Sequence, residues 1–290
     1  MNMNMTTKLE GFYSIKVHGG KRGEIDFGTH KNMILDAGIT HMLNGNYPLE
    51  YIHIGSGSSQ PNPRQVQLDA KFAHTNRSKN FKDGYVSAED SESGRAYGYG
   101  RITVQFDKGA AKGNIAELGV GNNTQGNPLW SRSLVLDKTG NPTTITVLED
   151  EFLTVTYEVR RYVNTETVMT TLQYDDDGEM KSVECSIVPS SDKSSVGWGS
   201  AGLTITSRAF PPLYNPSSSN GFKKIVDGSR ASFFIKYGIG EGNNQDISSP
   251  HTDEMHPLIP IKTKLLFNPP LRKTNEFELT IGITVTIERA

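Results

Sequence analysis

Residues 277–288 read FELTIGITVTIE, and apolar and polar side chains alternate along the whole of this stretch. The side chains of a β-strand point alternately to opposite faces, so this period of two places every large apolar residue on one face. One face would then be buried and the other would be polar, which is typical of an antiparallel sheet that packs on one side. The stretch therefore predicts a strand whose apolar face covers a core.

The same two-residue period recurs along the rest of the chain. Residues 153–160, LTVTYEVR, show it most clearly, and shorter matches occupy residues 13–17, 52–54, 102–106, 145–147, 203–205 and 233–237. Gly, Asn, Asp and Pro separate these segments, as turn residues do between short strands. The 29 glycines and 14 prolines would also interrupt long helices. We therefore predict an all-β fold of antiparallel β-sandwich domains, of the jelly-roll or immunoglobulin-like type.

One short helix is predicted near residues 33–44. Asn32 is of a residue type that caps a helix N-terminus, and Asn44-Gly45 supplies a stop signal. The apolar residues between them share roughly one helical face: Ile34, Leu35, Ile39, Met42 and Leu43. Because the segment is short and contains Gly38, the stability of this helix must come from docking on a sheet.

Long polar stretches give the two halves of the chain a different character. Four of them are rich in Ser, Gly, Asn and Pro: residues 55–67, 189–199, 211–221 and 238–256. Three follow residue 165, and loops longer than about 12 residues are usually functional, disordered or awaiting a partner. We predict an N-terminal β domain over residues 1–165 and a C-terminal β domain with long loops over residues 166–290. The boundary falls near Asn164–Thr167, and a single core shared by the two halves is the alternative.

Charge and hydropathy exclude two classes of partner. The 30 Lys and Arg nearly cancel the 32 Asp and Glu, which leaves a formal net charge of -2. No global basic field therefore attracts nucleic acid or an anionic membrane surface. No stretch approaches the roughly 18 apolar residues of a membrane helix, and the first residues, MNMNMTTKLEGFYS, hold no secretory signal. We expect no membrane insertion, and we expect the protein to be made and to fold in a cytosol.

Cys185 is the single cysteine of the chain. It excludes an intramolecular disulfide framework and any zinc or iron–sulfur site that needs several cysteines. The residue alternates with Val183 and Ile187, so we expect a buried strand position rather than a reactive thiol.

Nucleotide and metal motifs are absent or incomplete. Residues 55–59, GSGSS, follow a predicted strand but lack a Lys-Ser/Thr, and Pro61 prevents a helix from starting there, so a turn is the better interpretation. Residues 251–256 hold two histidines, Asp253 and Glu254, yet without helical spacing, which favours a solvated loop. Residues 175–179, DDDGE, lack the ligand pattern of an EF-hand and predict a hairpin turn.

Catalytic motifs are absent from the sequence as well. No serine occupies a G-x-S-x-G elbow, although a carboxylate pair for glycoside hydrolysis would leave no trace in sequence spacing. Four aromatic residues could form a sugar-stacking surface but are better explained as core or interface residues: Trp130, Trp198, Phe210 and Tyr214. We predict no catalytic residue, no cofactor-binding residue, no metal ligand and no cofactor, so the chain is not expected to be an enzyme.

Several short motifs occur in a characteristic order. They are residues 31–39, KNMILDAGI; residues 52–57, IHIGSG, with Pro61; residues 116–121, AELGVG; residues 129–134, LWSRSL; residues 144–147, TITV; residues 151–158, EFLTVTYE; and residues 267–274, FNPPLRKT. In this order they resemble the small structural proteins of tailed bacteriophages, which open with an N-x-I-x-D-A-G helix and an I-G-x-G-x-x-x-P turn. The resemblance covers most of residues 12–162 and about residues 265–288, and leaves residues 166–264 without a match.

The resemblance implies a virion protein of the tail: a fibre, an appendage or an adaptor that is assembled in the bacterial cytoplasm. Such a protein is expected to form a homo-oligomer and to bind other virion proteins, because repeated subunits bury strand edges against their neighbours. The family has no catalytic residues to carry over. The unmatched residues 166–264 are where we expect contacts with other subunits or with a host-surface glycan.

Two other functions fit the same sequence. A head decoration or collar protein would have similar β architecture, and it would also be an oligomer. A carbohydrate-binding or polysaccharide-degrading tail protein is the second alternative, although the sequence lacks the regular repeats of a parallel β-helix.

Overall fold

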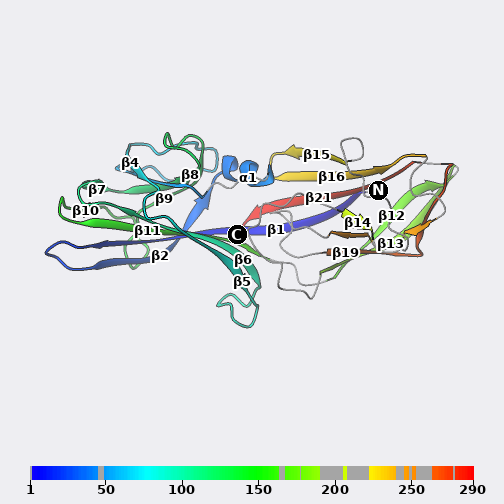
Figure 1. Ribbon diagram of the computed structural model, residues 1–290, viewed down its shortest axis with the longest axis horizontal. Helices are drawn as coiled ribbons and strands as arrows, with labels where there is room; N and C mark the ends of the chain where they lie inside the picture. Colours follow the sequence, from blue (N-terminus) through cyan, green and yellow to red (C-terminus); the bar gives the residue numbers. More distant parts are fainter. Residues whose placement is uncertain are drawn as a thin grey trace. The chain divides into compact units, whose positions relative to one another are not determined.

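Strands make up most of the computed structural model, and one short helix accompanies them in the part of the chain that it describes (Figure 1). The structure describes residues 2–44, 49–162, 167–176, 178–189, 205–207, 222–239, 245–247, 250–252, 263–276 and 278–290. Neighbouring strands such as β1 and β2, β8 and β9, and β12 and β13 pair antiparallel. The predicted all-β fold with one short helix is therefore confirmed.

The described residues form two compact units. Unit 1 contains Met1–Thr7, Ser87–Tyr97 and Tyr162–Glu288, and unit 2 contains Lys8–Val86, Gly98–Arg161 and Arg289–Ala290. Residues 163–166, which include most of the predicted boundary, lie outside the described residues. Independent folding of residues 1–165 and 166–290 stays a prediction.

Unit 2 is built on one long sheet. Its elements are β1 (Asn2–His18, which begins in unit 1), β2 (Ile25–Ile34), α1 (Asp36–Leu43), β3 (Tyr51–Gly55), β4 (Lys71–Thr75), β5 (Asn80–Val86), β6 (Tyr97–Phe106), β7 (Gly113–Ile115), β8 (Glu117–Gly121), β9 (Leu129–Leu134), β10 (Ile145–Val147) and β11 (Phe152–Tyr162). The strand order in the sheet is β5-β6-β11-β1-β2-β9-β8-β3-β4, and β7 pairs with β10 separately. The sheet curls, so that β6 comes close to the segment after β4: the backbone N–H of Gln105 in β6 donates to the carbonyl of Arg77 at 3.1 Å.

The curled sheet encloses the core of unit 2. Alternate residues of β1, β6 and β11 are buried, as their two-residue period predicts: Leu9, Tyr13, Ile15, Val17, Ile102, Val104, Phe106, Leu153, Val155, Tyr157 and Val159. Trp130 of β9 meets Tyr157 edge to face, with ring centroids 5.9 Å apart. The side chains between these buried positions form the opposite, partly exposed face of the sheet.

The predicted helix is present, but its predicted cap is wrong. Asn32 lies in β2, and the residue that precedes α1 is Leu35, whose side chain makes no capping hydrogen bond. The reason is that β2 extends to Ile34, which pairs with Ser131 of β9, so the chain turns only at Leu35. The backbone N–H of Leu35 donates to the carbonyl of Trp130 at 2.9 Å, which anchors the start of the helix on the sheet.

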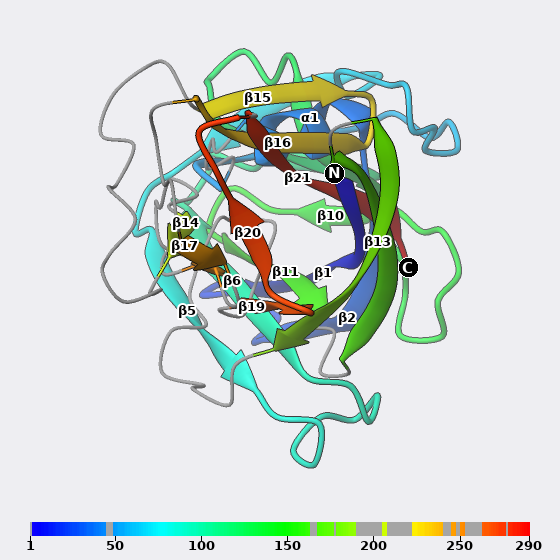
Figure 2. The same cartoon turned by 90° about the vertical axis from the view of Figure 1, so that its right-hand side faces the viewer.

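Unit 1 contains three further sheets or parts of sheets. Its strands are β12 (Val168–Asp176), β13 (Glu179–Pro189), β14 (Ile205–Ser207), β15 (Phe222–Asp227), β16 (Arg230–Tyr237), β17 (Gln245–Ile247), β18 (Pro250–Thr252), β19 (Thr263–Asn268), β20 (Leu271–Lys273) and β21 (Leu279–Arg289, whose last residue is in unit 2). The strand orders are β15-β16-β21, β12-β13-β19-β18-β14 and β17-β20. Figure 2 shows the β15–β16 hairpin and the long, curved β13.

The stretch FELTIGITVTIE forms β21 from Leu279 onward, while Phe277 lies outside the described residues. Leu279, Ile281, Val285 and Ile287 are buried, as the alternation predicts. Thr284 on the polar face is buried as well, and its hydroxyl lies 2.8 Å from that of Ser232 on β16.

The predicted loops have mixed outcomes. Residues 56–70 are irregular between β3 and β4, as predicted for residues 55–67. Residues 190–199 and 211–221 lie outside the described residues. The prediction that residues 238–256 form one loop is wrong in part, because β17 and β18 lie within it and pair with β20 and β14.

Candidate functional site

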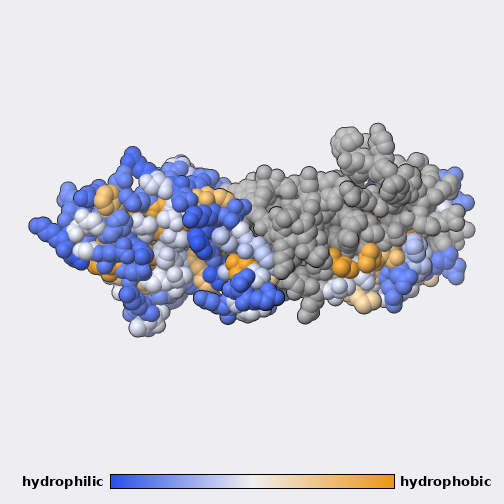
Figure 3. All heavy atoms as spheres, turned by 60° about the horizontal axis from the view of Figure 1, so that its bottom comes forward, coloured by the Kyte–Doolittle hydropathy of each residue, from blue (hydrophilic) through white to orange (hydrophobic). Residues whose placement is uncertain are grey.

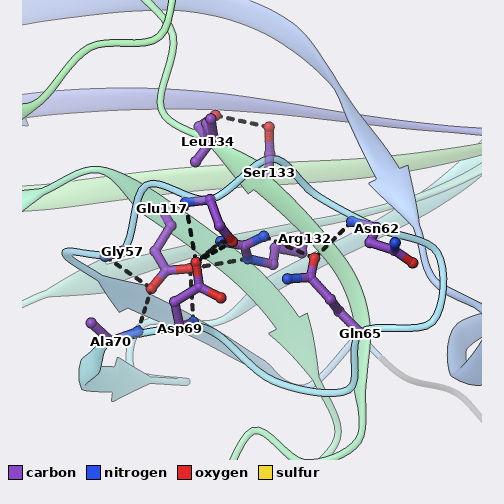
Figure 4. Close-up of polar contacts among 10 residues, drawn as sticks. Gly57, Asn62, Gln65, Asp69, Ala70, Glu117, Arg132, Ser133 and Leu134 are labelled. Atoms are coloured by element: carbon purple, nitrogen blue, oxygen red, sulfur yellow. Dashed lines mark hydrogen bonds and ion pairs between the residues drawn. The ribbon is translucent and has the colours of Figure 1, made fainter.

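Three motifs of the N-terminal half, IHIGSG, AELGVG and LWSRSL, meet at one buried ion pair (Figure 4). Glu117 on β8 and Arg132 on β9 are both fully buried, and the Nη2 atom of Arg132 lies 2.8 Å from Oε2 of Glu117. Glu117 also accepts three backbone hydrogen bonds from the loop after β3, from Gly57 at 3.1 Å, Asp69 at 3.1 Å and Ala70 at 2.7 Å. A buried charge pair is tolerated when its remaining hydrogen bonds are satisfied, as they are here.

Arg132 holds the same loop through side chains. Its Nη2 donates to Asp69 at 2.8 Å, and its Nη1 donates to Gln65 at 2.8 Å. A hydrogen bond from Ser59, together with the charge of Arg132, holds the pKa of Asp69 below its usual range. We call Glu117, Arg132, Asp69 and Gln65 the loop clamp, because these residues fix residues 56–70 against the sheet.

The loop clamp explains the two glycines of the I-G-x-G motif. A Cβ atom on Gly55 would lie 2.6 Å from Oε1 of Glu117, and one on Gly57 would lie 2.5 Å from it. Real Cβ atoms essentially never come so close to another heavy atom. A Cβ on Gly57 would also lie 2.5 Å from Cβ of Asp69, and one on Gly55 would lie 2.7 Å from the carbonyl oxygen of Ala70. The glycines are therefore required by Glu117 and by the loop that it holds, which agrees with the interpretation of residues 55–59 as a turn.

A second buried carboxylate is held in the same way. Glu151, which precedes β11, is fully buried and accepts hydrogen bonds from Arg22 Nε and from the backbone N–H of Leu148, both at 2.8 Å. A Cβ on Gly20 would lie 2.5 Å from Cγ of Glu151. The hydrogen bond from Arg22 is the main cause that holds the pKa of Glu151 below its usual range. The tip of the β1–β2 hairpin is thereby attached to the turn before β11.

The partly exposed face of the sheet carries a groove of about 270 Å³. We call it the arginine groove; its lining residues come from β1, β2, β6 and β11 and are Phe12, Tyr13, Ser14, Thr29, Arg101, Thr156, Glu158 and Arg160. All of them belong to unit 2.

Two arginines of the arginine groove share one carboxylate. Arg101 Nε donates to Oε2 of Glu158 at 2.6 Å, and Arg160 Nε donates to Oε1 at 2.5 Å. The side chain of Glu158 is only 7% exposed, whereas those of Arg101 and Arg160 are 42% and 22% exposed. The three side chains together carry one net positive charge at the mouth of the groove.

Aromatic rings support both guanidinium groups. The guanidinium carbon of Arg160 lies 4.1 Å from the centroid of the Phe12 ring, and that of Arg101 lies 5.2 Å from the centroid of the Tyr99 ring. Such cation–π contacts stabilise a guanidinium by about 0.5–1 kcal/mol when exposed. The orientation of each guanidinium is therefore set from two sides, by a ring and by Glu158.

Hydroxyl groups line the rest of the arginine groove. Ser14 and Thr29 lie directly opposite each other on β1 and β2, and the register of this pair of strands shifts between Ser14 and Lys16. A register shift of this kind bends a strand and re-aims its side chains, and such shifts are over-represented next to active sites. On the neighbouring strand β11, the hydroxyl of Thr156 lies 2.9 Å from that of Thr103.

A buried histidine lies under the loop after β8. His53 on β3 is fully buried, and within the described chain neither of its ring nitrogens makes a hydrogen bond of good geometry. A Cβ on Gly126 would lie 2.9 Å from its Nδ1, so the loop passes directly over the ring. Burial is the main cause that lowers the pKa of His53 to about 3, and the charge of Lys71 acts in the same direction. His53 is therefore a neutral core residue at ordinary pH.

Several residues that the sequence singled out lie within the part of the chain that the structure describes. Trp130 is buried, which confirms its assignment to the core. Asp176 and Glu179 of the DDDGE segment pair across the β12–β13 hairpin, with Gly178 at φ +80°, while Asp177 lies outside the described residues. Burial raises the pKa of the Cys185 thiol to about 11, as expected for an inert cysteine in β13. His251 lies in β18. The remaining candidates, Asp253, Glu254, His256, Trp198, Phe210 and Tyr214, lie outside the described residues.

The arginine groove was not predicted from the sequence. Its charged residues come from β6 and β11, and nothing in the local sequence connects them. One signal was present: Glu158 and Arg160 are two residues apart on a strand, so both point to the face opposite Tyr157 and Val159. Over the residues that the structure describes, no group of three or more His, Cys, Asp and Glu side chains could hold a metal ion.

No helix in the described part of the chain is both long and apolar enough to span a membrane. No family model, no curated protein and no solved structure matches the chain.

Proposed function

We propose that the chain is a non-enzymatic structural component of a bacteriophage virion, a tail fibre, appendage or adaptor protein that forms a homo-oligomer. The observation that carries the proposal is the loop clamp. The motifs I-G-x-G, AELGVG and LWSRSL, on which the resemblance depends, supply Gly55, Gly57, Glu117 and Arg132 to one internal network. The motif residues therefore support a scaffold, which is the role that a virion structural protein requires.

The surface of unit 2 supports assembly with other chains. Strand β4 ends the sheet and, among the described strands, pairs with β3 alone, so one of its edges is open. Phe72 on β4 and Phe81 on β5 are 44% and 43% exposed. Hydrophilic side chains prevail on the described part of the face in Figure 3, with apolar ones scattered among them. Open strand edges are usually covered by a neighbour or otherwise protected, and subunit contacts would serve that purpose.

Recovery of the chain in virus particles is the test of this proposal. We expect mass spectrometry to detect the chain in purified phage particles. The particles are propagated on the bacterium that the source phage infects and are purified by density-gradient centrifugation. An antibody against the chain should then label the tail in electron micrographs, whereas labelling of the head or the collar would favour the decoration or collar alternative. Absence from the particles would contradict the proposal.

Light scattering of the purified protein tests the homo-oligomer. A defined trimer, hexamer or ring is expected, with a mass that stays constant over a tenfold dilution. A monomer at every concentration would contradict self-assembly of the isolated chain. Phe72→Ser is the variant to compare with the wild type in this measurement, because it changes an exposed side chain on the open edge of β4 and leaves the core intact.

A further inference from the structure

We propose that residues 122–127, in the loop between β8 and β9, form a lid that opens when His53 beneath it takes up a proton in acid. We call these residues the His53 lid. His53 is fully buried, and the lid passes directly over its ring. Such a device makes the surface of unit 2 over β3 sensitive to pH. The inference goes beyond the proposed function and does not depend on it.

The closed lid leaves a charged imidazole ring without acceptors. A Cβ atom on Gly126 of the lid would lie 2.9 Å from Nδ1 of His53, and one on Gly121 of β8 would lie 3.4 Å from Nε2. Backbone therefore covers both ring nitrogens. A protonated ring has two N–H donors, yet within the described chain neither nitrogen makes a hydrogen bond of good geometry. Because a buried charge with unmet donors is costly, uptake of a proton favours exposure of the ring to water.

The neighbours of His53 provide no negative charge that would offset a proton. On β4, Lys71 and His74 lie nearby, and the ring centroids of His53 and His74 are 5.7 Å apart. On β3, the ring of Tyr51 has its centroid 6.3 Å away and adds no charge. Gly119 lies opposite His53 on β8, and the lid sequence, NNTQGN, holds no titratable side chain. A charged His53 would therefore face only the positive charge of Lys71 and, in acid, of His74.

The pKa of His53 agrees with this geometry. Burial is the main cause that lowers it to about 3, followed by the charges of Lys71 and His74. The nearby backbone of Asn123 favours the charged form, but its influence is smaller than those of the other three causes. An exposed histidine has a pKa of about 6.5, so the open state binds more protons than the closed state between these values. Opening should become about tenfold more favourable for each pH unit of acidification in this range.

Few side-chain hydrogen bonds tie the lid to the rest of the described chain. Nζ of Lys71 donates to the carbonyl oxygens of Thr124 and Gln125, the second at 2.9 Å. Nδ2 of Asn127 lies 3.5 Å from Oε1 of Gln67, at the limit of a hydrogen bond. Since the lid consists of polar residues and one glycine, its opening exposes little apolar surface. Segments with few buried apolar contacts are the ones that open locally while the rest of a protein stays folded.

NMR spectroscopy of the full chain, labelled with nitrogen-15 at histidine and glycine, tests the proposal between pH 7 and pH 4. The two hydrogen bonds from Lys71, at about tenfold each, favour the closed lid about 100-fold. We therefore expect the ring of His53 to become protonated with a midpoint about two pH units below 6.5, near pH 4.5. The amide resonance of Gly126 should change with the same midpoint. The amide of Gly38, which is buried in α1, should stay unchanged because the fold is retained.

Three variants identify the parts of the device. His53→Leu removes the titrating group and should abolish the pH response of Gly126. Lys71→Gln weakens the closed lid about tenfold and should raise the midpoint by about one pH unit. It retains His53, so it tests the lid even if His53→Leu does not fold. His41→Gln is the control, because it changes a partly exposed histidine on α1 and should respond like the wild type.

Four results would overturn the inference. If Gly126 keeps its neutral-pH resonance down to pH 4, the lid does not open. If Gly38 changes together with Gly126, the protein unfolds as a whole. If the His53→Leu protein keeps the pH response of Gly126, His53 is not the trigger. If Lys71→Gln has the midpoint of the wild type, Lys71 does not hold the lid. None of these results bears on recovery of the chain in virus particles or on its oligomeric state.

Discussion

Gly57 lies so close to Glu117 that a Cβ atom on the glycine would be 2.5 Å from the carboxylate oxygen. The backbone N–H of the same glycine donates to that oxygen at 3.1 Å. The absence of a side chain and the presence of the hydrogen bond are therefore two parts of one contact, which holds the loop after β3 on the sheet.

The first prediction concerns this contact. Gly57→Ala should lower the free energy of unfolding by about 1–3 kcal/mol, because the carboxylate or the loop must move. Urea denaturation measures the change, and Ser58→Ala, an exposed position in the same loop, is the control with little expected effect. The cost of Gly57→Ala should shrink in part when Glu117 is also replaced by alanine, because Cβ of Asp69, which is equally close, remains. An unchanged cost in that background would show that Glu117 is not the obstacle.

The second prediction concerns the ion pair itself. Glu117→Gln should lower the free energy of unfolding by about 3 kcal/mol, because Arg132 stays buried with less compensating charge. The matched change Asp107→Asn breaks an exposed pair with Arg77 and should cost at most about 1 kcal/mol. Equal costs in urea denaturation would contradict the role of the loop clamp.

The third prediction concerns acid stability. His53 has a pKa of about 3 in the folded protein, against about 6.5 in an unfolded chain, so the unfolded state binds more protons between these values. Stability should fall as the pH drops below about 6.5, and His53 should account for roughly 3 kcal/mol of the loss by pH 4.

Unfolding free energies at pH 7 and pH 4 check this prediction. His53→Leu should reduce the difference between the two values, whatever its effect at pH 7. His41→Gln changes a partly exposed histidine on α1 and should leave the difference nearly as it is in the wild type. If the His53→Leu protein showed the same difference between pH 7 and pH 4 as the wild type, the prediction would be wrong.

The fourth prediction concerns Cys185. Burial raises the pKa of its thiol to about 11, and only the thiolate is nucleophilic, so Ellman's reagent at pH 8 should label the native protein very slowly. Rapid labelling in urea provides the internal control. Fast labelling of the native protein, at the rate seen in urea, would mean that β13 exposes this residue.

Much of the fold could be predicted from the sequence because alternation is a local signal. The buried residues of β1, β11 and β21 follow the two-residue period directly. The cap of α1 could not be predicted in this way, since pairing of Ile34 with Ser131 decides where β2 ends. That pairing joins residues about a hundred positions apart, and no local pattern reports it.

The candidate site shows the same limit more strongly. The loop clamp was visible only as separate motifs, because Gly57, Glu117 and Arg132 come together through strand pairing. The arginine groove was invisible for another reason: Arg101 and Arg160 are ordinary polar positions of two strands that become neighbours only in the sheet. Register between distant strands, rather than residue type, creates both features.

The loop clamp also divides residues 55–70 into two classes with different evolutionary freedom. Gly55, Gly57 and Asp69 depend on Glu117 and Arg132 of the sheet, so substitution of one of these five residues should be accepted only with compensating changes at the others. Ser56, Ser58 and Gln60 are exposed and take no part in that dependence. The exposed residues of the loop can therefore diverge quickly between related chains. A recognition surface could change there while the scaffold beneath it stays the same.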